Sequence, residues 1–160
     1  MIAILHNIRS MHNVGSIFRT ADALGFKKIY LCGITPEPID RLGKIRSQFS
    51  KVSLGAEKNI YWEKSASSIK VINKLKEEKI KIFAIEQSKK STPYHKLKTN
   101  NYNLENIALV LGNEIHGLPN TILKKADKIL EIPMKGKKES LNVSVAFGIV
   151  GFGIYYSSFK

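Results

Sequence analysis

Short aliphatic runs that alternate with longer amphipathic segments constrain the fold of this chain more than any other feature. Runs of about five residues with few polar side chains are typical of strands buried inside a parallel sheet. They cover Met1–Leu5, Lys28–Cys32, Lys81–Ile85, Ile107–Leu111 and Lys128–Ile132, and a short strand is also predicted at Tyr61–Trp62.

Helical periodicity fills the segments between these runs. The predicted helices cover Val14–Leu24, Ala66–Glu78, the vicinity of Pro119–Lys125 and a last segment that starts at Asn142. Asn13 is the predicted N-cap of the first helix and Gly25 its stop, and Pro36–Asn59 is expected to be irregular or partly helical. Strands that alternate with helices predict an α/β fold, with a largely parallel sheet flanked by helices.

The length and composition favour one folded domain. No linker, repeat or low-complexity run divides the 160 residues, so we expect a single domain over residues 1–160, with no added RNA-binding domain. No apolar run approaches the roughly 18 residues that suggest a membrane span, and Met1–Leu5 is too short for a signal peptide. These observations predict a cytoplasmic protein with no membrane partner, and the lone Cys32 is expected in the core.

The charge balance points to a polyanionic partner. The formal net charge is +13, and lysines and arginines that neutralise phosphates gain affinity through counterion release. A lysine-rich composition can also produce such a charge without any binding surface. The four arginines all lie within the first 46 residues, beside the first of the polar loops described next.

Three polar loops follow predicted strands, where ligands gather in parallel α/β sheets. They read HNIRSMHNVGSIFRTADALGF, ALVLGNEIHGLP and IPMKGKKESLNVSVAFGIVGFGIYY. The chain has neither a dinucleotide-binding nor a P-loop glycine motif. Its four histidines lack the spacing of metal ligands, so no metal site is expected.

Taken together, the three loops resemble motifs 1, 2 and 3 of the SPOUT methyltransferases, in the TrmH (SpoU) family. The matching positions are Asn13, Gly15, Arg19, Gly112-Asn113-Glu114, Gly117, Pro133 and Ser140-Leu141-Asn142, and the resemblance runs from Asn7 to about Tyr155. This family transfers a methyl group from S-adenosylmethionine to a ribose 2'-hydroxyl of RNA. The resemblance implies a deep C-terminal trefoil knot that forms the cofactor pocket, and a homodimer formed through the first and last helices.

The resemblance also implies roles for individual residues. The implied catalytic residues are Arg19, Asn13, Glu114, Ser140 and Asn142. The resemblance implies that Arg19 acts as a base; because guanidinium resists deprotonation, Arg19 could equally hold a phosphate and stabilise developing alkoxide charge. Asn13 can cap its helix or orient the ribose, Glu114 can balance the sulfonium or position Arg19, and Ser140 and Asn142 can be a simple N-cap pair. Each has a plainer interpretation as a solvated or capping residue.

Two further sets of residues complete the implied site. The cofactor-binding residues are Ile85, Glu86, Leu111, Gly112, Ile132, Met134 and Leu141, and the RNA-binding residues are Arg9, Arg41, Arg46, Lys135, Lys137 and Lys138. The small size of the chain favours tRNA over rRNA as substrate. The alternatives are an rRNA methyltransferase, a non-catalytic RNA-binding protein on the same fold, and an α/β enzyme that acts on a small anion.

Three glycines in the last predicted helix need an explanation, because glycine inside a helix costs about 0.5–1 kcal/mol. They are Gly148, Gly151 and Gly153. Given the resemblance, we expect them to permit close approach of backbones in the knot and across the dimer interface.

Overall fold

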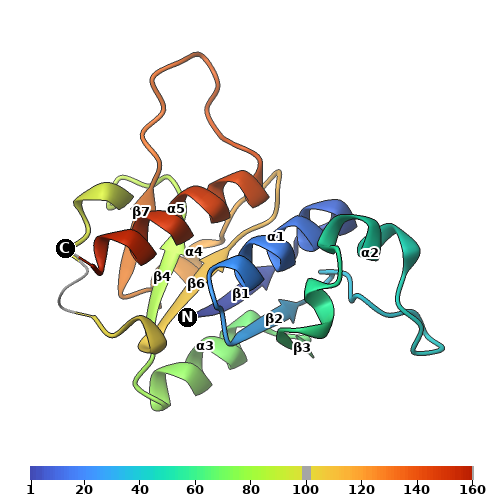
Figure 1. Cartoon of the computed structure of the whole chain (residues 1–160). Helices are drawn as coiled ribbons and strands as arrows, with labels where there is room; N and C mark the ends of the chain where they lie inside the picture. The colour runs from blue at the N-terminus through green and yellow to red at the C-terminus, as the bar shows by residue number, and fades with distance from the viewer. Residues whose placement is uncertain (99–101, 160) are drawn as a thin grey trace.

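A seven-stranded sheet in which every pairing is parallel forms the centre of the computed structural model, which describes residues 1–98 and 102–159 (Figure 1). The strands are β1 (Ile2–His6), β2 (Lys28–Cys32), β3 (Tyr61–Ser65), β4 (Lys81–Ile85), β5 (Thr92–Pro93), β6 (Ile107–Leu111) and β7 (Lys128–Glu131). Their order is β3-β2-β1-β6-β4-β7-β5, which confirms the predicted largely parallel α/β fold. The central strand β6 is buried at all five positions, as its continuous aliphatic sequence predicts.

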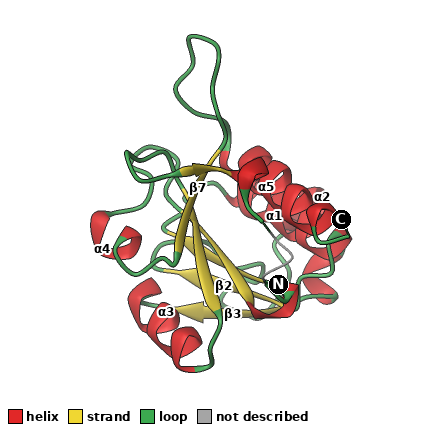
Figure 2. Ribbon diagram, turned by 90° about the vertical axis from the view of Figure 1, so that its left-hand side faces the viewer, coloured by secondary structure: helices red, strands yellow, loops and turns green. Residues whose placement is uncertain are grey.

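Helices cover both faces of the sheet (Figure 2). The helices α1 (Met11–Ala23), α2 (Ser47–Ser53) and α5 (Val143–Ser157) lie on one face, and α3 (Ser68–Glu77) and α4 (Asn120–Leu123) lie on the other. Two hydrophobic cores result, because successive strand residues point to opposite faces. Phe83 joins the core under α1 and α5, whereas its neighbours Ile82 and Ala84 join the core under α3 and α4.

Most predicted elements are present with shifted ends. The segment 36–59 is partly helical, as expected: it contains α2 and the short 3₁₀ helix Ala56–Lys58. The strand predicted at Tyr61–Trp62 continues to Ser65, because the whole segment pairs with β2. The short strand β5 and the 3₁₀ helices Tyr94–Lys96 and Leu104–Asn106 were not predicted.

The predicted N-cap of the first helix was wrong. Helix α1 starts at Met11, and its N-cap is Ser10, whose hydroxyl accepts a hydrogen bond from the Asn13 backbone N–H at 3.2 Å. Asn13 lies within the first turn, with its side chain turned into the protein and only 7% of the residue exposed. Asn142, in contrast, is the N-cap of α5, and its side-chain oxygen accepts from the Ser144 N–H at 2.9 Å.

Two of the three glycines in α5 make room for side chains rather than for backbone. A Cβ at Gly153 would lie 2.5 Å from the Tyr94 ring, and one at Gly151 would lie 2.8 Å from Cδ1 of Leu24, the C-cap residue of α1. Gly148 has more room, because the nearest atom, on Thr20, would be 3.7 Å away. Within the chain, these two glycines therefore make room for the side chains of Leu24 and Tyr94, and not for another backbone segment as expected.

Across residues 1–98 and 102–159, none of the helices combines the length and the apolar character that crossing a bilayer requires.

Candidate functional site

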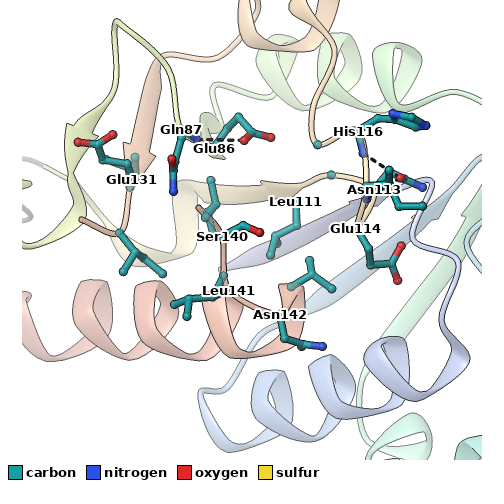
Figure 3. A pocket seen from close by; sticks show the side chains of 18 of the residues that line it. Glu86, Gln87, Leu111, Asn113, Glu114, His116, Glu131, Ser140, Leu141 and Asn142 are labelled. Atoms are coloured by element: carbon teal, nitrogen blue, oxygen red, sulfur yellow. Dashed lines mark hydrogen bonds between the residues drawn. The ribbon is translucent and has the colours of Figure 1, made fainter. Parts of the chain in front are cut away.

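A pocket of about 330 Å³ opens at the carboxyl ends of three neighbouring strands (Figure 3). The parallel register pairs Ile85 of β4 with Leu111 of β6 and with Leu130 of β7, so the loops that follow these strands meet at one edge of the sheet. The start of α5 and the loop before it close the other side of the pocket. The chain thus brings the second and third polar loops together around one cavity.

The lining contains every residue that the sequence predicted for the cofactor, namely Ile85, Glu86, Leu111, Gly112, Ile132, Met134 and Leu141. Three of the residues implied in catalysis, Glu114, Ser140 and Asn142, also line it. The wall is mixed, with aliphatic side chains beside carboxylates and amides. Such a pocket suits a small molecule that has both an apolar and a charged part.

Glycine is required where two backbone segments meet at the floor of the pocket. A Cβ at Gly112 would lie 2.5 Å from the Gly117 carbonyl oxygen and 2.6 Å from the Leu118 nitrogen. Gly117 has a φ of 61°, and a Cβ there would overlap the Glu86 carboxylate. That carboxylate accepts a hydrogen bond from the Leu118 N–H at 2.7 Å, which ties the turn to the end of β4. The backbone of this loop is therefore held in place and available to a ligand.

Glu114 joins the second polar loop to the first. Its Oε2 accepts from the Arg9 N–H at 3.0 Å, and its Oε1 accepts from the Ser10 N–H and from the Asn13 side-chain amide, both at 3.0 Å. Both carboxylate oxygens are thus used to hold the start of α1. Glu114 is a clamp between the two loops in this structure.

The ionisation of Glu114 follows from the same contacts. Partial burial alone would raise the pKa of Glu114, but hydrogen bonds from the backbone of Arg9, Ser10 and Glu114 itself and from the Asn13 amide hold that pKa below its usual value. The carboxylate is therefore negatively charged at neutral pH.

Asn13 extends this connection to the third loop. Because its Nδ2 donates to Glu114, its Oδ1 is free to accept from Asn142 Nδ2 at 3.0 Å. Asn142 Oδ1 in turn accepts from the Ser144 N–H and hydroxyl, at 2.9 and 2.7 Å. A continuous series of hydrogen bonds therefore joins the three polar loops, and Asn13 and Asn142 orient one another at its centre.

Arg19 lies elsewhere. It is exposed on α1, two turns beyond Asn13, and it is not part of the pocket lining of its own chain. Neighbouring Thr20 faces Gly148 of α5, so Arg19 is carried by the helix that packs beside the pocket-forming helix. Within its own chain, Arg19 therefore does not contribute to the wall of the pocket.

The predicted RNA-binding residues are exposed but spread over two regions. Lys135, Lys137 and Lys138 lie on the loop between β7 and α5, which projects from the molecule above the pocket (Figure 1). Arg9 is next to the pocket, because its backbone contacts Glu114. Arg41 and Arg46 lie in the segment before α2, outside the pocket lining.

The sequence analysis assigned no role to several polar residues of the lining, although it named Asn113 as a motif position. Glu131 ends β7 and accepts a hydrogen bond from the Ser91 hydroxyl at 2.6 Å, and the Gln87 amide donates to the Glu139 carbonyl oxygen at 2.5 Å. Asn113 donates to the Asn7 carbonyl oxygen at 2.8 Å, and His116 lies beside it. Their signal was present: each follows or ends an aliphatic run at the edge where ligands gather.

In the described ranges, 1–98 and 102–159, no group of three or more His, Cys, Asp or Glu side chains is arranged to hold a metal ion.

Comparison with known proteins supplies a family. The model of the SpoU rRNA Methylase family matches residues 1–152. The 23S rRNA (guanosine-2'-O-)-methyltransferase RlmB of Neisseria meningitidis serogroup B is 32% identical over 151 residues, which are 94% of this chain and 56% of that protein. The tRNA (guanosine(18)-2'-O)-methyltransferase of Aquifex aeolicus is 33% identical over 150 residues, which are 94% of this chain and 66% of that protein.

Solved structures show the same fold. The A. aeolicus TrmH/SpoU tRNA modifying enzyme has a TM-score of 0.81 at 30% identity, over 98% of this chain and 74% of its own. The AdoMet-bound rRNA methyltransferase from Sinorhizobium meliloti has a TM-score of 0.84 at 26% identity, over 97% of this chain and 55% of its own. The chain spans a little more than half the length of several curated relatives that it matches.

Proposed function

Because the chain belongs to the SpoU rRNA Methylase family, we propose that it is an RNA methyltransferase, which transfers a methyl group from S-adenosylmethionine to a ribose 2'-hydroxyl. The observation that carries the proposal is the pocket at the strand ends, whose lining is joined to the first polar loop by the Glu114, Asn13 and Asn142 contacts. The RlmB and tRNA methyltransferase relatives are named for this type of reaction.

The pocket fits S-adenosylmethionine by size and chemistry. Its volume of about 330 Å³ falls in the range of small-molecule sites. Ile85, Leu111 and Leu141 offer apolar contacts for an adenine ring, and the backbone around Gly112 offers hydrogen-bonding groups. Glu86 and Glu131 provide negative charge for the cationic parts of the molecule. When bound, the cofactor supplies an electrophilic methyl group on a sulfonium sulfur.

The protein's own task is alignment and proton removal. A ribose hydroxyl must be placed in line with the methyl group and must lose its proton, and positioned side chains accelerate both steps. Ser140 and Asn142 line the pocket at the start of α5, where they can contact the ribose. Asn13 acts by holding the Asn142 side chain, and Glu114 holds Asn13 and the backbone at the start of α1.

Arg19 is the proposed group for the developing oxyanion and the neighbouring phosphate. Its guanidinium stays protonated at any working pH, so stabilisation of negative charge is its most direct role. Since Arg19 lies outside its own chain's pocket lining, we propose that it serves the pocket of a second copy of the chain.

A homodimer through α5 and α1 would provide that second copy. Three apolar side chains of α5 are 38–61% exposed and share one helix face at spacings of seven and four residues, namely Val145, Phe152 and Tyr156, and exposed Phe159 follows the helix. An apolar stripe of this kind is typical of a covered surface. The trefoil knot, the cytoplasmic location and the preference for tRNA remain predictions.

The test is methyl transfer from labelled S-adenosylmethionine to total tRNA and, separately, to rRNA, followed by mapping of the modified nucleotide. We expect a 2'-O-methylated nucleotide in one of the two pools. Arg19→Ala should nearly abolish transfer while cofactor affinity stays unchanged, and Arg19→Lys should remain well below wild type because lysine lacks the planar fork. Cofactor and RNA binding without any transfer would favour the non-catalytic alternative.

A further inference from the structure

A second hollow lies at the edge of the sheet on the side of α4, and its lining shares no residue with that of the pocket already described. It has a volume of about 670 Å³, twice that of the pocket. Its lining comes from two stretches of the chain, one from the turn after β4 into β5 and one from α4 to the start of β7. The residues are Ser88, Lys89, Lys90, Thr92, Asn120, Leu123, Lys124, Ala126, Asp127, Lys128 and Ile129. We call it the lysine groove.

Four lysines give the groove its charge: Lys89, Lys90, Lys124 and Lys128. Within residues 1–98 and 102–159, none of these four forms an ion pair within 4.0 Å. The only acid in the lining, Asp127, is engaged elsewhere, since its Oδ2 accepts from the Ile82 N–H at 2.8 Å. Like charges around one hollow repel one another, and a bound polyanion relieves that repulsion.

The turn that presents Lys89 and Lys90 is held in a defined shape. The Ser91 N–H donates to the Ser88 carbonyl oxygen at 3.0 Å, and the Ser91 hydroxyl lies 2.6 Å from the Glu131 carboxylate. Glu131 lines the pocket, so the same short segment is tied to both hollows. The two lysines are therefore held by the folded edge of the sheet.

The groove and the pocket are continuous along the chain. Glu86 and Gln87 line the pocket, and the next three residues, Ser88 to Lys90, line the groove. A polymer with one nucleotide at the mouth of the pocket would reach the groove by passing around the β5 edge of the sheet, because the groove lies on the α4 side and the pocket is closed by the start of α5.

We propose that the lysine groove binds the phosphodiester backbone of the RNA on one side of the nucleotide that is methylated. The proposal rests on the proposed function for the identity of the polyanion. It assigns RNA binding to a surface apart from Lys135, Lys137 and Lys138, which lie on the projecting loop between β7 and α5.

The test compares three double variants that remove the same charge. Lys89→Gln/Lys90→Gln and Lys124→Gln/Lys128→Gln change the groove, and Lys51→Gln/Lys58→Gln changes two exposed lysines in α2 and the 3₁₀ turn that follows it. Binding of total tRNA is measured by filter retention over a series of KCl concentrations. The affinity for S-adenosylmethionine, measured by calorimetry, shows whether the pocket stays intact.

Each phosphate that a lysine neutralises contributes about 0.7–0.9 to the slope of log K against log salt. We expect each groove variant to lower the slope by about one to two and to weaken binding roughly tenfold at low salt, with cofactor affinity unchanged. The control pair should change the slope by less than half as much. If the slope of log K against log salt in both groove variants equals that of the Lys51→Gln/Lys58→Gln control, the proposal is wrong.

The outcome is separable from that of the proposed function, because binding is measured without methyl transfer. If wild type transfers no methyl group but the groove variants lose slope, the groove stands and the proposed function fails. If methyl transfer occurs and the groove variants bind like the control, the proposed function stands and the groove is wrong.

Discussion

Replacing Glu114 with glutamine should destabilise the protein by removing the charge that holds the first polar loop to the second. The carboxylate accepts three hydrogen bonds at 3.0 Å, from the Arg9 and Ser10 N–H groups and the Asn13 amide. In Glu114→Gln one oxygen becomes an NH₂ group, which must face an N–H donor. Hydrogen bonds to a charged acceptor are worth about 1.5–3 kcal/mol, and the partly exposed position reduces this by screening. We therefore expect a loss of about 2 kcal/mol in the free energy of unfolding.

The pH dependence gives the sharper test. The pKa of Glu114 is lowered by folding, so its stabilisation is present above the unfolded value of 4.5 and is lost as the pH falls through the lower folded value. The difference between wild type and Glu114→Gln should be full at pH 7 and shrink below about pH 4.5.

Urea unfolding followed by circular dichroism at pH 7 and at pH 3.5 measures both quantities. Glu77→Gln, which changes an exposed carboxylate near the end of α3, serves as the control and should have little effect at either pH. A difference for Glu114→Gln that is the same at both pH values would refute the reasoning, because it would show that charge is not what the loop depends on.

Three further changes test other parts of the structure. Gly112→Ala should abolish cofactor binding and cost about 3 kcal/mol or more, because the clash is with backbone that cannot give way; calorimetry and unfolding measure both, and near-normal binding would contradict it. Gly153→Ala should cost about 1–3 kcal/mol in wild type, but little in a Tyr94→Ala background where the ring is absent; equal costs in both backgrounds, measured by urea unfolding, would argue against the docking role. Ser10→Ala should cost about 1 kcal/mol through loss of the α1 cap, and no change in the unfolding midpoint would contradict that assignment.

The sequence by itself determined six of the seven strands of the described sheet, most of the helices and the edge of the sheet where the pocket lies. Aliphatic runs such as Ile107–Leu111 have the length of a strand and lack the alternating polar residues of a half-exposed one. Their burial could therefore be predicted from the sequence of the run alone. Ligand sites follow the carboxyl ends of parallel strands, and Ile85, Leu111 and Ile132, which the family resemblance implied for the cofactor, line one cavity there.

Tertiary structure decided how the side chains of that site are used. Asn13 is of a residue type that often caps helices, yet its side-chain amide forms hydrogen bonds with Glu114 and Asn142, which are 101 and 129 positions away in the chain. The cap passes to Ser10, since Asn13 is buried in the first turn. Arg19 is a second example. Nothing in the sequence around it indicates that it lies outside the pocket lining of its own chain.

The physical reason is the range of the interactions. The spacing of apolar residues, helix caps and turns depends on residues that are close in sequence, so these features can be recognised from the sequence alone. The contacts that position a carboxylate or an amide are made between segments that only the folded sheet brings together, and the side chains that fill the space above Gly151 and Gly153 come from α1 and from the 3₁₀ helix Tyr94–Lys96. The sequence shows that two glycines inside a helix require an explanation. The explanation, which is the packing of Leu24 and Tyr94 against them, is visible only in the structure.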